Sequence, residues 1–136
     1  MAIATDELGP ERRVLLVDDD PDIREMYGAR LSADGFDVSF AADGHQALAA
    51  ATGRPAMILL DLHMPGPNGI EVLGRLKRNA ATAEVPVVML SNDGDSATKA
   101  LCAEAGAADW WSKCRVTPAE LSRRVSGLLG LATSPA

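Results

Sequence analysis

Acidic, hydroxyl and ammonium side chains follow four short apolar runs of the sequence, at the point where each run ends. The carboxylates are Asp18, Asp19, Asp20 and Asp61, and the other groups are Ser91, Asn92 and Lys113. Crowded carboxylates repel one another, and a hard divalent cation relieves that repulsion. Mg²⁺ prefers one or two carboxylates together with water and phosphate oxygens, so this set is a candidate half-site for Mg²⁺.

The same residue types suit phosphoryl transfer. A carboxylate can act as a nucleophile and form an acyl phosphate. Transfer mainly requires in-line positioning and neutralisation of the phosphoryl oxygens, which a metal, a lysine and a hydroxyl would supply. Each group alone has a plainer interpretation as a turn, a helix cap or a solvated side chain, and Asp20 is assigned to a helix cap. Only their joint placement at four run ends favours a site.

The runs themselves predict strands. Short, continuously apolar runs bounded by turn residues are typical of parallel strands covered on both faces. They lie at residues 14–17, 57–60 and 85–90, and weaker strands are expected at 36–40, where Phe36, Val38 and Phe40 alternate with other residues, and at 109–112.

Helices are expected between the strands. The first follows Asp20 and Pro21 and ends near Gly35, with Ile23, Tyr27 and Leu31 on one face. The others are expected over 43–52, around Ile70, Leu73 and Leu76, over 96–105, and from Thr117-Pro118, the last burying Leu121, Val125, Leu128 and Leu129. Five strand–helix units predict an α/β fold, a parallel sheet with helices on both faces. Ligands of such sheets bind outside the carboxyl ends of the strands.

Length and composition fit one domain. The 136 residues carry a net charge of −6 with no strongly basic stretch, which argues against non-specific binding to nucleic acid or to an anionic membrane. Cys102 and Cys114 have neither zinc nor redox spacing, and a reduced, cytoplasmic setting is expected. Residues 1–11 are interpreted as a flexible leader, 12–130 as the domain, and 131–136 as a tail or linker stub.

Four segments resemble the receiver domain of response regulators in two-component systems. They are residues 15–24 (LLVDDDPDIR), 58–66 (ILLDLHMPG), 87–92 (VVMLSN) and 105–113 (AGAADWWSK), in the family's order and spacing. The resemblance covers residues 12–130 and implies a flavodoxin-like, five-stranded sheet of order 2-1-3-4-5.

The resemblance also implies individual roles. Asp61 would accept the phosphoryl group, and Mg²⁺, or Mn²⁺ in its place, would be held by Asp18, Asp19, Asp61 and the backbone carbonyl of His63. The phosphoryl-binding and switch residues would be Ser91, Asn92, Lys113 and the aromatic Trp110.

Three positions depart from the family pattern. Cys114 stands where the family usually has a proline after the lysine, often with a cis bond. A cis bond before a non-proline costs about 2.5–4 kcal/mol, so a trans Lys113–Cys114 bond and an altered loop are expected. Trp110 is larger than the usual switch tyrosine or phenylalanine, which puts the usual inward swing in doubt. Pro67-Asn68 replaces an apolar-Asp pair and should stiffen its loop.

The functional hypothesis is a non-enzymatic switch. A sensor histidine kinase or phosphotransfer protein would phosphorylate Asp61, and a remodelled face around the fourth helix, fifth strand and fifth helix would bind a downstream protein or form a homodimer. No direct nucleic-acid partner is expected, because no DNA-binding domain follows in the sequence, and the acidic net charge argues against a membrane partner. Alternatively, the chain is one domain cut from a longer regulator or a hybrid kinase. Two alternatives remain: a phosphorylation-independent docking domain of the same fold, and a haloacid-dehalogenase-like hydrolase, whose Asp-x-Asp pair is missing because position 63 is histidine.

Overall fold

The sheet of this α/β protein has five parallel strands in the order β2-β1-β3-β4-β5, as predicted. The structure is a computed structural model that describes residues 9–92 and 94–131. The strands are β1 (Arg13–Val17), β2 (Asp37–Ala41), β3 (Met57–Leu60), β4 (Val87–Leu90) and β5 (Asp109–Trp111). The helices are α1 (Pro21–Ala33), α2 (Gly44–Ala51), α3 (Gly69–Arg78), α4 (Ser96–Glu104) and α5 (Pro118–Leu128).

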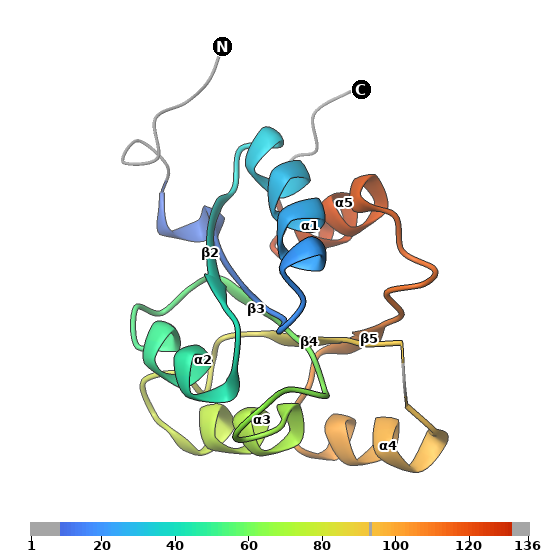
Figure 1. Cartoon of the computed structure of the whole chain (residues 1–136). Coiled ribbons are helices and arrows are strands. Elements are labelled where there is room, and N and C mark those ends of the chain that lie inside the picture. The colour runs from blue at the N-terminus through green and yellow to red at the C-terminus, as the bar shows by residue number, and fades with distance from the viewer. Residues whose placement is uncertain (1–8, 93, 132–136) are drawn as a thin grey trace.

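The sheet lies between two layers of helices (Figure 1). Helices α1 and α5 cover one face, and α2, α3 and α4 cover the other. Alternate residues of the central strands supply two separate cores, as the period of two in a strand requires. Leu16 and Leu59 belong to the α1/α5 core, whereas Leu15 and Leu60 belong to the core beneath α2, α3 and α4.

Helix starts follow the capping residues that the sequence predicts. The Asp20 side chain accepts from the Asp22 N–H at the start of α1, with Pro21 in the first helical position. Thr117 caps α5 in the same way. A capping side chain accepts a hydrogen bond from a backbone N–H that has no partner within the helix. Asp20 and Thr117 therefore determine the residues at which α1 and α5 begin.

One expectation about burial was wrong. Leu128 is 48% exposed and not part of the core, because the face of α5 that packs on the α1/α5 core is formed by Leu121 and Val125 and is continued by Leu129. Phe40 in β2 is 47% exposed. It lies over Gly28 of α1, where an added Cβ would collide with the ring.

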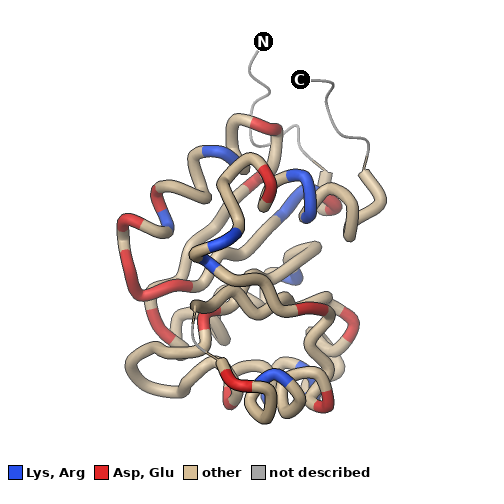
Figure 2. The backbone as a smooth tube through the Cα atoms, turned by 90° about the vertical axis from the view of Figure 1, so that its right-hand side faces the viewer, with Lys and Arg blue, Asp and Glu red and all other residues tan. Residues whose placement is uncertain are grey.

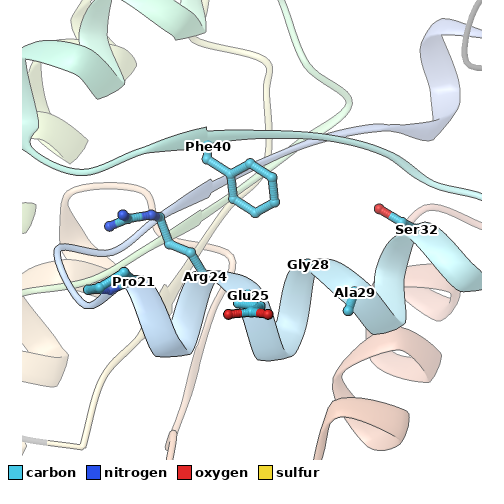
Figure 3. Close-up of a pocket in the computed structure, with 7 residues that line it drawn as sticks. All are labelled: Pro21, Arg24, Glu25, Gly28, Ala29, Ser32 and Phe40. Carbon is cyan, nitrogen blue, oxygen red and sulfur yellow. The ribbon is translucent and has the colours of Figure 1, made fainter.

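An open groove of about 500 Å³ lies between α1 and the edge strand β2. Figure 3 shows Phe40 on one side and the α1 residues on the other. Its lining consists of Pro21, Arg24, Glu25, Gly28, Ala29, Ser32 and Phe40. The groove is distinct from the acidic strand ends, although Arg24 contacts both.

The chain ends extend beyond the described residues. The expected leader, 1–11, lies largely outside them, and its described part enters a short 3₁₀ helix, Pro10–Arg12. Within the expected tail, Leu131 packs against the α1/α5 core, and 132–136 lie outside the described residues. Among the helices described, none is long and apolar enough to cross a membrane.

Substitution of two glycines should change stability in opposite directions. At Gly69, an added Cβ would lie 2.7 Å from Leu62 Cα and would overlap the Asp61 carbonyl. We therefore expect Gly69→Ala to lower the free energy of unfolding by about 1–3 kcal/mol. Gly127 lies in α5 with nothing within 4 Å of an added Cβ, so Gly127→Ala should raise it by about 1 kcal/mol. Urea unfolding followed by circular dichroism measures both, and a Gly69→Ala variant as stable as the wild type would contradict the close packing.

Candidate functional site

Three of the predicted site residues are anchored by backbone hydrogen bonds at the ends of adjacent strands. The Asp18 N–H donates to Ala41 O at 3.1 Å, and the Asp61 N–H donates to Val17 O at 3.0 Å. The Ser91 N–H donates to Trp111 O at 3.1 Å. The sheet therefore fixes where these three side chains begin, at its carboxyl edge.

Three carboxylates converge at this edge. Oxygen atoms of Asp18, Asp19 and Asp61, one from each, lie within 4.8 Å of one another. Asp18 and Asp61 are buried, at 0% and 4% exposure, whereas Asp19 is exposed. The cluster thus has two buried members and one facing solvent, which is the arrangement of a site open on one side.

Lys113 bridges the two buried carboxylates. Its Nζ lies 2.6 Å from Asp18 Oδ2 and 3.3 Å from Asp61 Oδ1. Burial works to lower the pKa of Lys113, but the interactions of its ammonium with the carboxylates of Asp18 and Asp61 outweigh it, and the pKa is raised. Lys113 is therefore a fixed cation in this site at neutral pH.

The acidity of Asp61 is perturbed by its surroundings. Burial and the neighbouring Asp18 charge raise the pKa of Asp61, and Lys113 and the Leu62 N–H only partly oppose them. A carboxylate with a raised pKa in a cleft is a common feature of functional sites. One cation facing two buried anions leaves a net negative charge here.

The acidic loop after β1 is ordered by its own side chains. Asp18 Oδ1 accepts from the Asp20 N–H at 2.9 Å, and the Arg24 guanidinium donates to Asp18 O at 2.7 Å. Asp20 caps α1, as predicted, so its carboxylate accepts from a backbone N–H of the helix and is not a member of the carboxylate cluster. Asp19 is left as the exposed member of the cluster.

The loop after Asp61 is held close to the strand end. The Gly69 N–H donates to Leu62 O at 2.8 Å, and Asn68 caps α3 by accepting from the Glu71 N–H at 3.0 Å. Pro67 is buried against Gly44 at the start of α2. His63 lies two residues beyond Asp61 with an exposed side chain.

The remaining predicted residues are Ser91, Trp110 and Asn92, and each lies in a different environment. Ser91 is 2% exposed and follows β4 directly. Trp110 is partly buried against the α2, α3 and α4 core. The Lys99 Nζ lies over its ring, 5.8 Å from the ring centroid. Asn92 is exposed, and its Oδ1 accepts from the Cys114 N–H at 2.6 Å. Asn92 thus links two loops, a role that its position after Ser91 did not predict.

Tyr27 is a residue that the sequence marked only as core. Its hydroxyl donates to Val116 O at 2.7 Å and lies 3.3 Å from Lys113 O, so it holds the loop that carries the lysine. These partners are more than 80 residues away along the chain. The helical period predicts that Tyr27 is buried, but no pattern in the sequence indicates where its hydroxyl finds a partner. The Lys113–Cys114 bond is trans, as predicted, like every described peptide bond.

The residues present fit a hard divalent cation. Asp18 Oδ2 is buried, and the Lys113 ammonium 2.6 Å away is its charge partner. The same ammonium also faces Asp61, so one cation serves two buried carboxylates, and buried charges are stable only when they are paired or coordinate a metal. With Asp19 and Asp61 beside Asp18, this all-oxygen donor set is of the kind Mg²⁺ prefers.

Comparisons with known proteins agree with this geometry. A model of the response regulator receiver domain family matches residues 14–126. The DNA-binding response regulator MtrA from Mycolicibacterium smegmatis is 43% identical over 119 residues, which are 87% of this chain and 50% of that protein. The phosphate regulon transcriptional regulatory protein PhoB from Pseudomonas aeruginosa is 38% identical over 119 residues, 87% of this chain and 52% of that protein.

Solved structures give the same result. The chemotaxis protein CheY4 of Vibrio cholerae superimposes with a TM-score of 0.78 at 31% identity, covering 85% of this chain and 96% of that one. The receiver domain of the sensor histidine kinase PA1611 from Pseudomonas aeruginosa, with a magnesium ion in its active-site cleft, has a TM-score of 0.79 at 28% identity, covering 88% and 98%.

Fold and sequence together define a CheY-like receiver domain. The chain belongs to the response regulator receiver domain family of two-component signalling systems. The resemblance seen in the sequence is therefore confirmed.

The expectation about partners needs correction. We expected no nucleic-acid partner, but the relatives MtrA and PhoB are a DNA-binding response regulator and a transcriptional regulatory protein. The chain spans about half the length of these curated relatives. Basic and acidic residues are interspersed on the side of the domain seen in Figure 2. Neither the charge of one domain nor the point where the given sequence ends carries information about domains joined to it, so a nucleic-acid partner was wrongly rejected.

Stability of the metal-free protein should depend on Asp61. Because its pKa is raised in the folded state, the folded protein holds this proton more tightly than the unfolded chain does. Stability therefore falls as the pH rises through the interval between the ordinary and the raised pKa. At neutral pH, Asp61→Asn should raise the free energy of unfolding by about 1 kcal/mol.

Thermal unfolding in the presence of a chelator measures this difference at several pH values. The matched control is Asp43→Asn, because Asp43 caps α2 and asparagine caps a helix equally well. A metal-free Asp61→Asn variant less stable than the wild type at neutral pH would contradict the electrostatic argument.

Proposed function

We propose that this chain is a phosphoacceptor receiver domain in which Asp61 takes a phosphoryl group from a phosphohistidine on a partner protein. The observation that carries the proposal is the Lys113 ammonium held between Asp18 and Asp61, at 2.6 and 3.3 Å, beside the exposed carboxylate of Asp19. A nucleophilic carboxylate, a fixed cation and a set of metal ligands then meet at one strand edge.

In the transfer step, an Asp61 carboxylate oxygen forms a bond to phosphorus as the phosphorus–nitrogen bond of the donor breaks. The electron pair of that bond returns to the imidazole of the donor. The backbone hydrogen bond from Asp61 N to Val17 O holds the nucleophile at a fixed place on the sheet. Such positioning accounts for much of the catalysis of phosphoryl transfer.

Asp18, Asp19 and Asp61 would hold Mg²⁺, or Mn²⁺ in its place, with the His63 backbone carbonyl as a further ligand. A bound Mg²⁺ neutralises negative charge on the phosphoryl oxygens. Lys113 would pair with another phosphoryl oxygen, and the buried Ser91 would donate its hydroxyl to the attached group. The arriving group is a dianion, so Lys113 exchanges part of its pairing with the carboxylates for the phosphoryl group.

The domain would act as a switch and not as an enzyme. Movement of Ser91 and Lys113 toward the phosphoryl group biases the face formed by α4, β5 and α5, where Trp110 lies, and a protein partner reads the two states. Whether Trp110 swings inward stays a prediction. The domain bounds 12–130 and a cytoplasmic setting belong to the same proposal.

Phosphorylation is tested by mass spectrometry after incubation with Mg²⁺ and acetyl phosphate. The wild type and the Asp43→Asn control should each gain one phosphoryl group, and Asp61→Asn should gain none. Omission of Mg²⁺ should abolish the gain. Uptake by Asp61→Asn at the wild-type level would place the acceptor elsewhere, and a wild type that takes up nothing from acetyl phosphate and binds no beryllofluoride would favour the phosphorylation-independent docking domain.

Metal binding is tested independently by calorimetric titration with Mg²⁺. Asp19 is exposed, so Asp19→Asn removes a ligand with little effect on the fold, and we expect at least a tenfold weaker affinity, about 1.4 kcal/mol. Asp20→Asn is the matched control, because it makes the same change one residue later at a helix cap. Equal weakening by both substitutions would show a general charge effect and not a ligand.

A further inference from the structure

The loop that carries Lys113 is closed by its own backbone. The N–H groups of Arg115 and Val116 both donate to Ser112 O, each at 3.1 Å. Lys113 lies inside this turn, and its ammonium reaches into the carboxylate cluster. The position of the turn therefore determines where the ammonium can lie.

Two side chains from other elements hold the turn. From α1, the buried Tyr27 hydroxyl donates to Val116 O at 2.7 Å. From the end of β4, Asn92 Oδ1 accepts from the Cys114 N–H at 2.6 Å. Both contacts are to backbone atoms of the turn, so they act on its placement whatever the lysine side chain does.

The Asn92 contact joins two particular places in the site. Asn92 directly follows Ser91, and Cys114 directly follows Lys113. The hydrogen bond therefore sets the distance between the backbone positions that carry the hydroxyl and the ammonium. A proline at position 114 has no N–H and could not make this bond, so the bond depends on a non-proline residue there.

We propose that Asn92 is a positioning residue, whose amide oxygen holds the Cys114 N–H and thereby keeps Lys113 in register with Ser91 for phosphoryl transfer. The proposal rests on the proposed function in one respect, namely that Lys113 pairs with the phosphoryl group. In this proposal, Asn92 contacts neither the carboxylates nor the phosphoryl group. A role in positioning the turn thus stands in place of the direct phosphoryl contact that the resemblance implied for Asn92.

Amide hydrogen exchange tests the contact in the metal-free, unphosphorylated protein. Cys114 is exposed, so its N–H should exchange quickly unless Asn92 protects it. Asn92→Ala should speed its exchange by about fivefold. Asn92→Asp keeps an acceptor oxygen and should preserve the protection.

The matched control for this experiment is Asn79→Ala. Asn79 is also exposed and also accepts a backbone N–H through Oδ1, from Ala81 at 2.9 Å, but it lies in the turn after α3. It should leave Cys114 exchange unchanged. Equal exchange rates in the wild type and Asn92→Ala would overturn the proposed contact.

Phosphorylation kinetics with acetyl phosphate test the consequence. Asn92→Ala should slow the rate at saturating donor by about tenfold, while the half-saturating donor concentration and the Mg²⁺ affinity stay within about twofold. Cys114→Pro removes the N–H that Asn92 accepts, so Asn92→Ala should cause no further loss of rate when it is added to Cys114→Pro. Asn79→Ala should react like the wild type.

Each contrary outcome has a separate meaning. If Asn92→Ala slows the Cys114→Pro variant as much as it slows the wild type, Asn92 does not act through the Cys114 N–H and the inference fails. If Mg²⁺ affinity falls in parallel with the rate, the site has collapsed, and Asn92 is structural and not a positioning residue. If the wild type is phosphorylated and Asn92→Ala matches it, the inference fails alone, whereas a wild type that takes up no phosphoryl group overturns the proposed function together with it.

Discussion

The properties of the site at the carboxyl edge of the sheet depend on the charge balance between one lysine and two buried carboxylates. Asp18 and Asp61 end adjacent strands, so the parallel register brings them together whether or not their charges agree. Lys113 offsets part of that repulsion from the end of β5, across the intervening strand β4. A hydrophobic sheet thus holds a site whose own electrostatics oppose its stability, which is a common compromise at functional sites.

That balance leaves room for additional positive charge. Two anions face one cation in a buried position, and the third carboxylate, Asp19, lies at the open side. The charge and the oxygen donors of such a site suit a divalent cation. Under the proposed function, the same site would repel an incoming phosphoryl dianion in the absence of that cation, so the metal and the phosphoryl group would depend on each other through their charges.

The sequence was sufficient to predict the strands and the groups at their ends because both depend on local signals, whereas the strand order was implied by the resemblance to receiver domains. Apolar runs identify the strands, Asp20 and Pro21 identify a helix start, and the acidic and basic residues lie at the run ends. Longer-range contacts could not be predicted in this way. Tyr27 and Asn92 were marked as a core residue and a phosphoryl contact, but their partners in the turn after β5 are set by tertiary packing. Leu128 fits the helical period as well as Leu129 does, but only Leu129 packs on the α1/α5 core, and Leu128 is exposed.

The turn after β5 illustrates two physical ways of fixing a loop. A proline restricts the backbone through its ring, and the restriction is permanent. Here Cys114 leaves the backbone free, and hydrogen bonds from Tyr27 and to Asn92 supply the restriction instead. Hydrogen bonds of this kind contribute only about 1 kcal/mol each, so the turn can be released at modest cost. Under the proposed function, the turn would follow its lysine toward the newly attached group, and hydrogen bonds that can break would oppose that movement less than a proline ring.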